Sequence, residues 1–421
     1  MHQPHQSQTG EPASPRAGQE RAPGRPGLSR GMVLLLAVTC GVAVGNVYFP
    51  QAVSPLVADG LGVSADTAAL VVTATQFGYA GGIFLLVPLG DRIPYRTLIV
   101  TLLALTGLGL LGAGAAPGLS PLVGASVLVG VTTVIAQVIA PMAAGLVPEE
   151  RRGAVTGTLL SGSIGGMLLS RVFGGAVGEW LGWRAPYLMT AVVTLLIACV
   201  LARALPRSTA PSRQRYPALL AEALRLLRTE PDLRRSGFYQ AMIFGAFSAL
   251  WTGVALLLTG PTYGLGASAV GVLALVNAGT MICTPVAGRQ VDRRGSDAVN
   301  LVCMVAVLVA AAVLFFGGLG GAVGLVALAV GSLLLDVAMQ SGTVANQVRI
   351  FGLSDEARAR LNTAYMTCAY LGGSVGSWLA VRAYGAFGWA GVCGLVVLLT
   401  GLALGRHVAH LMRVGRPVDV G

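Results

Sequence analysis

The chain has 421 residues, of which 54% are hydrophobic and only 11% are charged, and its mean hydropathy is +0.74. Soluble proteins carry about 25% charged residues, so this composition excludes an ordinary soluble domain. The formal net charge of +11 comes from arginine, because the sequence contains no lysine. A Walker A loop requires lysine, so this chain cannot drive transport with ATP through such a loop.

Apolar runs long enough to cross ~30 Å of hydrocarbon recur along nearly the whole chain. A helix satisfies its own backbone polar groups in lipid, so each run is predicted to be a transmembrane helix. The expected fold class is therefore an all-α membrane protein with an even number of spans. We predict twelve, at residues 32–50, 67–89, 97–116, 120–145, 154–177, 185–204, 236–259, 267–287, 298–318, 320–346, 361–383 and 386–405.

The placement of arginine predicts the orientation of these spans. When the chain is threaded through twelve spans, 25 of the 28 arginines fall on one side of the membrane. The positive-inside rule makes that side cytoplasmic, with both termini inside a cell (plasma) membrane. Residues 1–31 are polar and rich in Pro and Gly, and we expect a disordered cytoplasmic leader there rather than a secretory signal. Because membrane topology accounts for the positions of the arginines, the positive net charge does not indicate a nucleic-acid partner.

Residues 205–235 divide the spans into two sets of six. This cytoplasmic linker separates an N-terminal bundle, 32–204, from a C-terminal bundle, 236–405, which is followed by a tail, 406–421. Within the linker, "ALLAEALRLLR" has helical periodicity and is expected to lie along the membrane surface.

The two halves resemble each other at an offset of 206 residues. "PEERRGAVTG" (148–157) parallels "SDEARARLNT" (354–363), and small residues at every fourth position from Gly162 to Gly178 are repeated from Cys368 to Ala380. Such stripes let helices pack backbone to backbone. A parallel repeat of six spans is typical of transporters that bind substrate between their halves near the midplane.

Two loops carry related charged motifs. "GRQVDRRG" (288–295) contains Asp292 and Arg293, and "VPLGDRIPYR" (87–96) contains Asp91 and Arg92. On these motifs and the repeat, the chain resembles the major facilitator superfamily, which implies two pseudo-symmetric six-helix bundles. The resemblance assigns these four residues to loops that gate access by contacts across the cytoplasmic face; the alternative is solvated loops whose arginines set the topology.

Within this superfamily, the chain also resembles a bacterial branch whose members are usually labelled as drug or metabolite efflux proteins. "TQFGYAGGIFLLVPLGDR" and "RLNTAYMTCAYLGGSVGS" carry that resemblance. The glycine- and proline-bearing motif of drug antiporters is half present, because "SGSIGGMLLSRVFGG" has the glycines without the proline.

A single carboxylate, Asp336, lies deep in an expected span. It precedes Arg349 by 13 residues, which places it about 20 Å from the cytoplasmic edge. Carboxylates at this depth usually face a cavity or a partner and serve ion or proton pathways. A polar stripe that includes Ser332, Gln340 and Thr343 shares its helical face. We therefore name Asp336 as a proton-coupling candidate; the alternative is a polar residue that joins helices.

Arg171 is the second ionisable residue within a span. It lies about 19 residues beyond Arg152 and some 9 Å outward of Asp336 along the helix axes. Arg171 is a second ion-coupling candidate, although its side chain could instead reach the interface. The difference in depth means that a direct ion pair with Asp336 cannot be assumed.

Amide and aromatic residues in several spans suit a pocket for an amphiphilic organic ligand. Each one taken alone is also compatible with ordinary helix packing. The substrate-cavity candidates are Asn46, Gln76, Tyr79, Gln240, Phe244, Trp251, Asn277, Gln340, Thr343 and Tyr370.

These features predict a secondary active transporter that works by alternating access. No histidine lies in an expected span and no H-E-x-x-H occurs, so we expect no enzyme activity, no metal and no cofactor. A channel or sensor is a weaker alternative, because no filter motif or charged ring is visible. We predict proton-coupled export of a small organic compound by a monomer, with proton-coupled uptake of a metabolite as the alternative.

Overall fold

The computed structural model describes residues 28–206, 215–277, 280–354 and 357–414. These ranges form helices and contain no strand, so the all-α prediction is confirmed. Most of the expected leader, residues 207–214 of the linker and the last residues of the tail lie outside the described residues. The elements are α1 (Arg30–Leu61), α2 (Ala65–Ala68), α3 (Leu70–Leu86), η1 (Val87–Asp91), α4 (Tyr95–Gly114), α5 (Leu119–Thr132), α6 (Ile135–Gly145), α7 (Glu149–Leu181), α8 (Arg184–Ala204), α9 (Tyr216–Thr229), α10 (Pro231–Thr259), α11 (Ser268–Val276), α12 (Thr280–Phe315), η3 (Phe316–Leu319), α13 (Gly321–Phe351) and α14 (Arg358–Val414).

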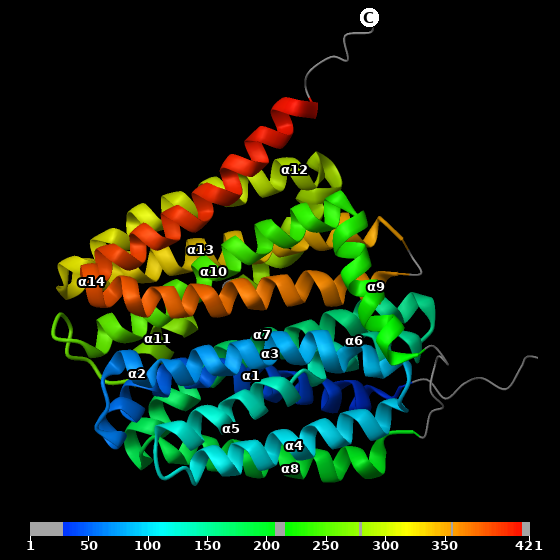
Figure 1. Cartoon of the computed structure of the whole chain (residues 1–421), viewed down its shortest axis with the longest axis horizontal. Helices are drawn as coiled ribbons and strands as arrows, with labels where there is room; N and C mark the ends of the chain where they lie inside the picture. Colours follow the sequence, from blue (N-terminus) through cyan, green and yellow to red (C-terminus); the bar gives the residue numbers. More distant parts are fainter. Residues whose placement is uncertain (1–27, 207–214, 278–279, 355–356, 415–421) are drawn as a thin grey trace, which may run out of the picture.

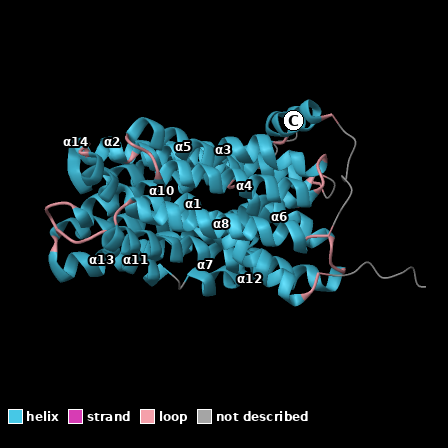
Figure 2. Ribbon diagram, turned by 90° about the horizontal axis from the view of Figure 1, so that it is seen from below, coloured by secondary structure: helices cyan, strands magenta, loops and turns pink. Residues whose placement is uncertain are grey.

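The long helices run roughly parallel, as Figures 1 and 2 show, and they lie in two layers, one above the other in Figure 1. Helices α1 to α8 form one layer and α10 to α14 form the other, in agreement with two bundles. The short helix α9 crosses from one layer to the other at the right-hand end in Figure 1. We call this end, which carries Arg30, Arg151, Arg234 and Arg349, the arginine-rich face.

Ten helices in the described ranges are long and apolar enough to cross a membrane. Two of the longest contain a turn at a glycine in a backbone conformation that residues with a Cβ rarely adopt. Gly295 has φ 79° within α12, and Gly388 has φ 60° within α14. Because each of these turns separates two helical limbs, the arrangement is consistent with twelve spans.

Close backbone contacts join the helices that carry the glycine stripes. A Cβ on Gly166 of α7 would collide with the backbone of Gly41 of α1, and a Cβ on Gly372 of α14 would collide with Ala241 of α10. The structure therefore confirms the prediction that these stripes allow backbone-to-backbone packing, and it shows the same packing in both halves.

Several helices extend beyond the expected spans. Helix α1 continues past Pro50 to Leu61 and ends at Gly62, whose φ is 64°. Helix α14 continues to Val414, so part of the expected tail is helical and His407 is buried within the fold. Helix α9 packs its Leu219 and Ala223 against the bundle.

Candidate functional site

The central carboxylate, Asp336, lies on α13 with only 2% of its surface exposed. One oxygen accepts a hydrogen bond from the indole Nε1 of Trp251, at 3.3 Å, and the other accepts one from the Nδ2 of Asn277, at 2.8 Å. Ser332 donates in turn to the Oδ1 of Asn277, at 3.4 Å. Neutral donors from α10 and from the end of α11 therefore hold this carboxylate, as a buried charge requires.

Arg171 lies on α7, in the other half, and is fully buried. Its Nε donates to the Oε1 of Gln51 at 3.1 Å. Its guanidinium carbon lies 4.1 Å from the ring centroid of Trp251, 5.1 Å from that of Tyr48 and 5.6 Å from that of Phe247. Within the described residues its two terminal nitrogens have no hydrogen-bond partner.

Trp251 therefore joins the two ionisable residues that the sequence singled out. Its N–H faces Asp336 and its ring face carries the guanidinium of Arg171. Arg171 belongs to the N-terminal half, whereas Trp251 and Asp336 belong to the C-terminal half. The two charges are thus connected through an indole across the boundary between the halves. Arg171 bonds to Gln51 and does not form an ion pair with Asp336 in the described residues, which agrees with the decision not to assume such a pair from the sequence.

A second polar group lies closer to the arginine-rich face along the same two helices. The Nε2 of Gln240 on α10 donates to the Oγ1 of Thr343 on α13, at 2.8 Å. The hydroxyl of Tyr365 on α14 donates to the Oε1 of Gln240, at 2.8 Å. Both predicted cavity residues of this group therefore pair with each other within the C-terminal half.

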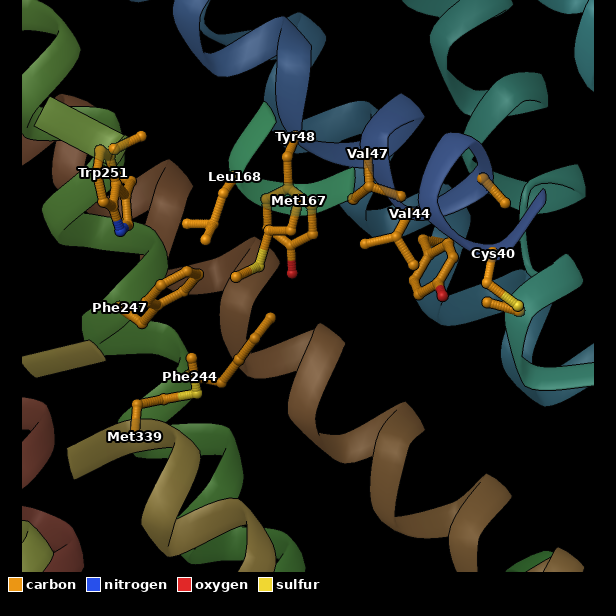
Figure 3. Packing of buried hydrophobic residues seen from close by; sticks show 14 of the residues in the cluster. Cys40, Val44, Val47, Tyr48, Met167, Leu168, Phe244, Phe247, Trp251 and Met339 are labelled. Atoms are coloured by element: carbon orange, nitrogen blue, oxygen red, sulfur yellow. The ribbon is translucent and has the colours of Figure 1, made fainter. Parts of the chain in front are cut away.

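Aromatic side chains from both halves meet between these polar groups. The ring centroids of Tyr79 and Tyr370 lie 4.4 Å apart, and those of Phe244 and Tyr370 lie 4.8 Å apart. The hydroxyls of Tyr48 and Tyr370 are 3.4 Å apart. Figure 3 shows Tyr48 directed toward Phe247 and Phe244 across the boundary. The predicted residues Tyr79, Phe244 and Tyr370 thus form one interface with Tyr48 and Phe247, which are not among the substrate-cavity candidates, between the two halves.

Three other candidates lie elsewhere. Asn46 is buried in the N-terminal half, where its Nδ2 donates to the Oγ1 of Thr133 at 3.4 Å. Gln76 is buried on α3, and neither polar atom of its side chain has a partner within the described residues. Gln340 is half-buried on α13. In the described part of the chain the side chain of Asp336 bonds to Trp251 and Asn277, and neither Asn46 nor Gln340 is hydrogen-bonded to it.

At the arginine-rich face, α9 bridges the two halves. The hydroxyl of Tyr216 on α9 donates to the backbone oxygen of Leu85 in the N-terminal half, at 2.6 Å. Glu222 on α9 forms an ion pair of 2.6 Å with Arg360 in the C-terminal half. Asp91, a predicted gating residue, lines a small cavity together with Arg360 and α9.

The other predicted gating residues contribute less to this face. Arg92 and Arg293 are exposed. The side chain of Asp292 lies outside the described residues.

At the opposite face the halves meet at backbone distance. A Cβ on Gly175 of α7 would come within 2.5 Å of the backbone oxygen of Ala267, and one on Gly271 of α11 would come within 2.6 Å of the Cα of Val172. The backbone N–H of Ser268 donates to the carboxylate of Glu179, at 3.0 Å. This face is therefore closed in the structure.

Sequence reasoning missed several residues that hold the site and its surroundings. Gln51 lies one residue beyond the expected end of the first span. The segment "VSPLVADGL" that follows it could have indicated that the helix continues past Pro50. Asp297 binds Arg235 at 3.1 Å and also binds Arg349, and its backbone oxygen lies 3.1 Å from Nε2 of the buried His407. No sequence spacing connects these residues, because they come from four separate helices. The described residues hold no cluster of side chains that could bind a metal.

The fold and the site between its halves define a class of membrane transporters. The Major Facilitator Superfamily model matches residues 34–377, and the chain belongs to this superfamily. It is thus a multi-pass membrane protein with a transport role rather than a catalytic one.

Similar proteins are named as transporters or resistance proteins. The chain is 34% identical to the "Probable transporter SCO4007" of Streptomyces coelicolor over 386 residues, which cover 91% of this chain and 88% of that protein. It is 30% identical to the "Chloramphenicol resistance protein" of Streptomyces lividans over 266 residues, or 62% of this chain and 67% of that protein. Among solved structures, the nucleoside transporter NupG matches with a TM-score of 0.72 at 12% identity, over 90% of this chain and 98% of that one, which supports the fold alone.

Proposed function

We propose that this protein is a secondary active transporter that exports a small organic compound in exchange for protons, by alternating access across a cell membrane. The observation that supports this proposal is the position of Asp336. It is a buried carboxylate that lies one indole away from a cation in the opposite half. A protonatable group at the boundary between two moving halves can load a proton in one state and release it in the other.

The contacts at the two faces support the alternating-access part of the proposal. The face opposite the arginines is closed by backbone contacts near Gly175 and Gly271, whereas α9 spans the halves at the arginine-rich face. We take the arginine-rich face as cytoplasmic, with both termini inside. Transport then requires the two sets of contacts to open in turn: those of Ser268 and Gly271 open while the α9 contacts hold, and the α9 contacts open while those of Ser268 and Gly271 hold.

The chemistry around Arg171 suggests how a substrate binds. Its terminal nitrogens are buried donors without partners in the described residues, and three aromatic rings surround its guanidinium. A buried unsatisfied donor is costly, so an acceptor on an organic substrate would find favourable hydrogen bonds there. We propose that Arg171, Trp251 and the aromatic interface of Tyr79 and Tyr370 form the substrate site.

Chloramphenicol is a suitable first probe, because one relative is named as a chloramphenicol resistance protein. In proteoliposomes, antiport predicts that an acidic lumen drives accumulation, whereas symport predicts that an acidic exterior does. The sign of the effective gradient therefore separates the proposed export from uptake. If chloramphenicol neither accumulates nor raises the melting temperature, a panel of organic compounds screened for thermal stabilisation supplies the next probe.

Asp336→Asn tests the coupling role. The variant is expected to lose accumulation driven by the pH gradient but to retain counterflow, which needs substrate binding without net proton movement. Asp59→Asn is the matched control, because Asp59 is an exposed carboxylate on α1. If Asp336→Asn accumulated substrate under the gradient as well as Asp59→Asn does, the proposed coupling role would be wrong.

A further inference from the structure

The outer surface of the C-terminal half contains an apolar groove between α10 and the two limbs of α14. Its volume is about 580 Å³. Leu371 and Val375 in its wall are each 43% exposed, so the groove opens away from the bundle, toward the surrounding lipid. We call it the α10–α14 groove; besides these two residues its walls include Phe238, Met242, Cys368 and Leu399.

Small residues create the space. Gly237 and Ala241 on α10 lie opposite Cys368 and Gly372 on α14, and a Cβ on Gly372 would collide with the backbone of Ala241. The helix axes are therefore close, but no large side chain covers the crevice beside them. In a membrane such a crevice must be filled by lipid, because water in contact with an apolar groove at this depth is unfavourable.

Two arginines mark one end of the groove. Arg234 lies near the beginning of α10 and Arg406 lies near the end of α14, and both line the groove and are exposed. The guanidinium carbon of Arg406 lies 4.7 Å from the ring centroid of Phe238, and Arg234 donates to the backbone oxygen of Arg228 at 2.5 Å. The nearby carboxylate of Asp232 is paired with Arg235 at 2.8 Å. Within the described residues neither Arg234 nor Arg406 forms an ion pair.

The N-terminal half provides an internal comparison. A groove of about 520 Å³ lies between α1, α7 and α8, and contacts between Gly41 and Gly166 correspond there to the contacts between Ala241 and Gly372. Leu34 occupies the position of Arg234, and Val200, which is 49% exposed, occupies the position of Arg406. The residues described as lining this groove include no charged side chain. Packing alone therefore does not require the two arginines.

We propose that the α10–α14 groove binds an anionic phospholipid from the leaflet at the arginine-rich face, with its phosphate between Arg234 and Arg406 and an acyl chain along the small residues. Arginine forms strong, directional hydrogen bonds with phosphate oxygens, and basic pockets at the edge of a membrane domain attract anionic headgroups. The site is separate from the substrate site, and its test does not depend on transport.

Native mass spectrometry of the full-length protein tests this proposal. The protein is titrated in neutral detergent with dioleoyl phosphatidylglycerol or dioleoyl phosphatidylcholine, which differ in headgroup but not in acyl chains. The expected result is one preferred phosphatidylglycerol adduct. Arg234→Gln combined with Arg406→Gln should lower its occupancy about tenfold, because each basic residue near an anionic headgroup contributes a substantial share of the binding.

The matched control combines Arg225→Gln with Arg413→Gln. It removes the same net charge from exposed arginines outside the groove and should leave the adduct unchanged. Equal losses in the two double variants would indicate diffuse charge attraction and would overturn the proposal, as would equal binding of phosphatidylcholine by the unmodified protein. Displacement of the adduct by inorganic phosphate alone would also overturn it, because it would identify an anion site rather than a lipid site.

The N-terminal groove allows a gain-of-function test. Leu34→Arg combined with Val200→Arg places arginines at the corresponding positions of the uncharged groove and is expected to add a second phosphatidylglycerol adduct. Melting temperatures with each lipid check that the variants are folded and provide a second measurement: phosphatidylglycerol should stabilise the unmodified protein more than it stabilises the Arg234/Arg406 double variant. An equal shift in both proteins would contradict the assignment.

Discussion

The indole of Trp251 donates a hydrogen bond to Asp336 at 3.3 Å while its ring lies under the guanidinium of Arg171 at 4.1 Å. One neutral side chain thus contacts a buried anion with its edge and a buried cation with its face, as the charge distribution of an aromatic ring favours. Because Arg171 comes from the opposite half, a change in the charge of Asp336 can alter a contact between the halves.

Trp251→Phe separates the two functions of this side chain. Phenylalanine keeps a ring for Arg171 but removes the donor to Asp336. We expect gradient-driven transport to fall about tenfold, because a hydrogen bond to a charged group contributes ~1.5 kcal/mol. Counterflow should fall less, since the ring contact remains. Transport in proteoliposomes under a pH gradient, compared with counterflow, measures the difference; equal losses in both assays would show that the hydrogen bond has no special role in coupling.

Arg171→Lys tests the need for a planar cation. Lysine keeps the charge but cannot lie flat on Trp251 while bonding to Gln51, so we expect transport to fall about tenfold or more. Arg184→Lys is the matched control: Arg184 lies 4.3 Å from the ring centroid of Trp183 and donates to the backbone oxygen of Ala116, outside the site. Initial rates for both variants decide the question, and similar rates would contradict a role for Arg171.

Gly166→Val is expected to destabilise the N-terminal half. Its Cβ would collide with the backbone of Gly41, and overpacking of this kind costs about 1–3 kcal/mol. Gly165→Val supplies the control, because a Cβ on Gly165 meets nothing within 4 Å. Thermal unfolding in detergent should show a lower melting temperature for the first variant only. Comparable decreases in melting temperature in the two variants would mean that the loss of stability comes from the lower helix propensity of valine and not from the close packing of Gly166.

Glu222→Gln should weaken the bridge at the arginine-rich face. It removes the charge that pairs with Arg360 at 2.6 Å, a contact in which both side chains are about three-quarters buried. A loss of ~1 kcal/mol corresponds to a factor of about 5 in an opening equilibrium. Maleimide labelling of Thr363→Cys, which lies in the adjoining cavity, should accelerate by about that factor in a background without other cysteines.

Glu230→Gln is the control for this measurement, because Glu230 lies in the same linker and no ion pair joins it to another described residue. Labelling that is equally fast in the two variants would show that the acceleration reflects the charge of the linker rather than the bridge to Arg360.

Much of the architecture could be predicted from the sequence because lipid imposes strict local rules. Apolar runs of bilayer length indicated the helices, and the offset of 206 residues indicated two halves. The orientation drawn from the one-sided arginines stays a prediction. Asp336 and Arg171 were conspicuous because ionisable residues are rare at membrane depth. These features can be identified from the order of residues along the chain, without knowing which helices pack together.

The tertiary structure alone decided which of these residues meet. Counting residues along the two helices predicted that Arg171 and Asp336 differ in membrane depth by some 9 Å. Such a count could not show that Trp251 connects them, because the contact also depends on helix tilt, helix rotation and side-chain length. Likewise, the amphipathic linker was expected on the membrane surface, but its Tyr216 and Glu222 bind the two halves. Sequence periodicity specifies which face of a helix is polar, whereas its partner depends on how all the helices pack together.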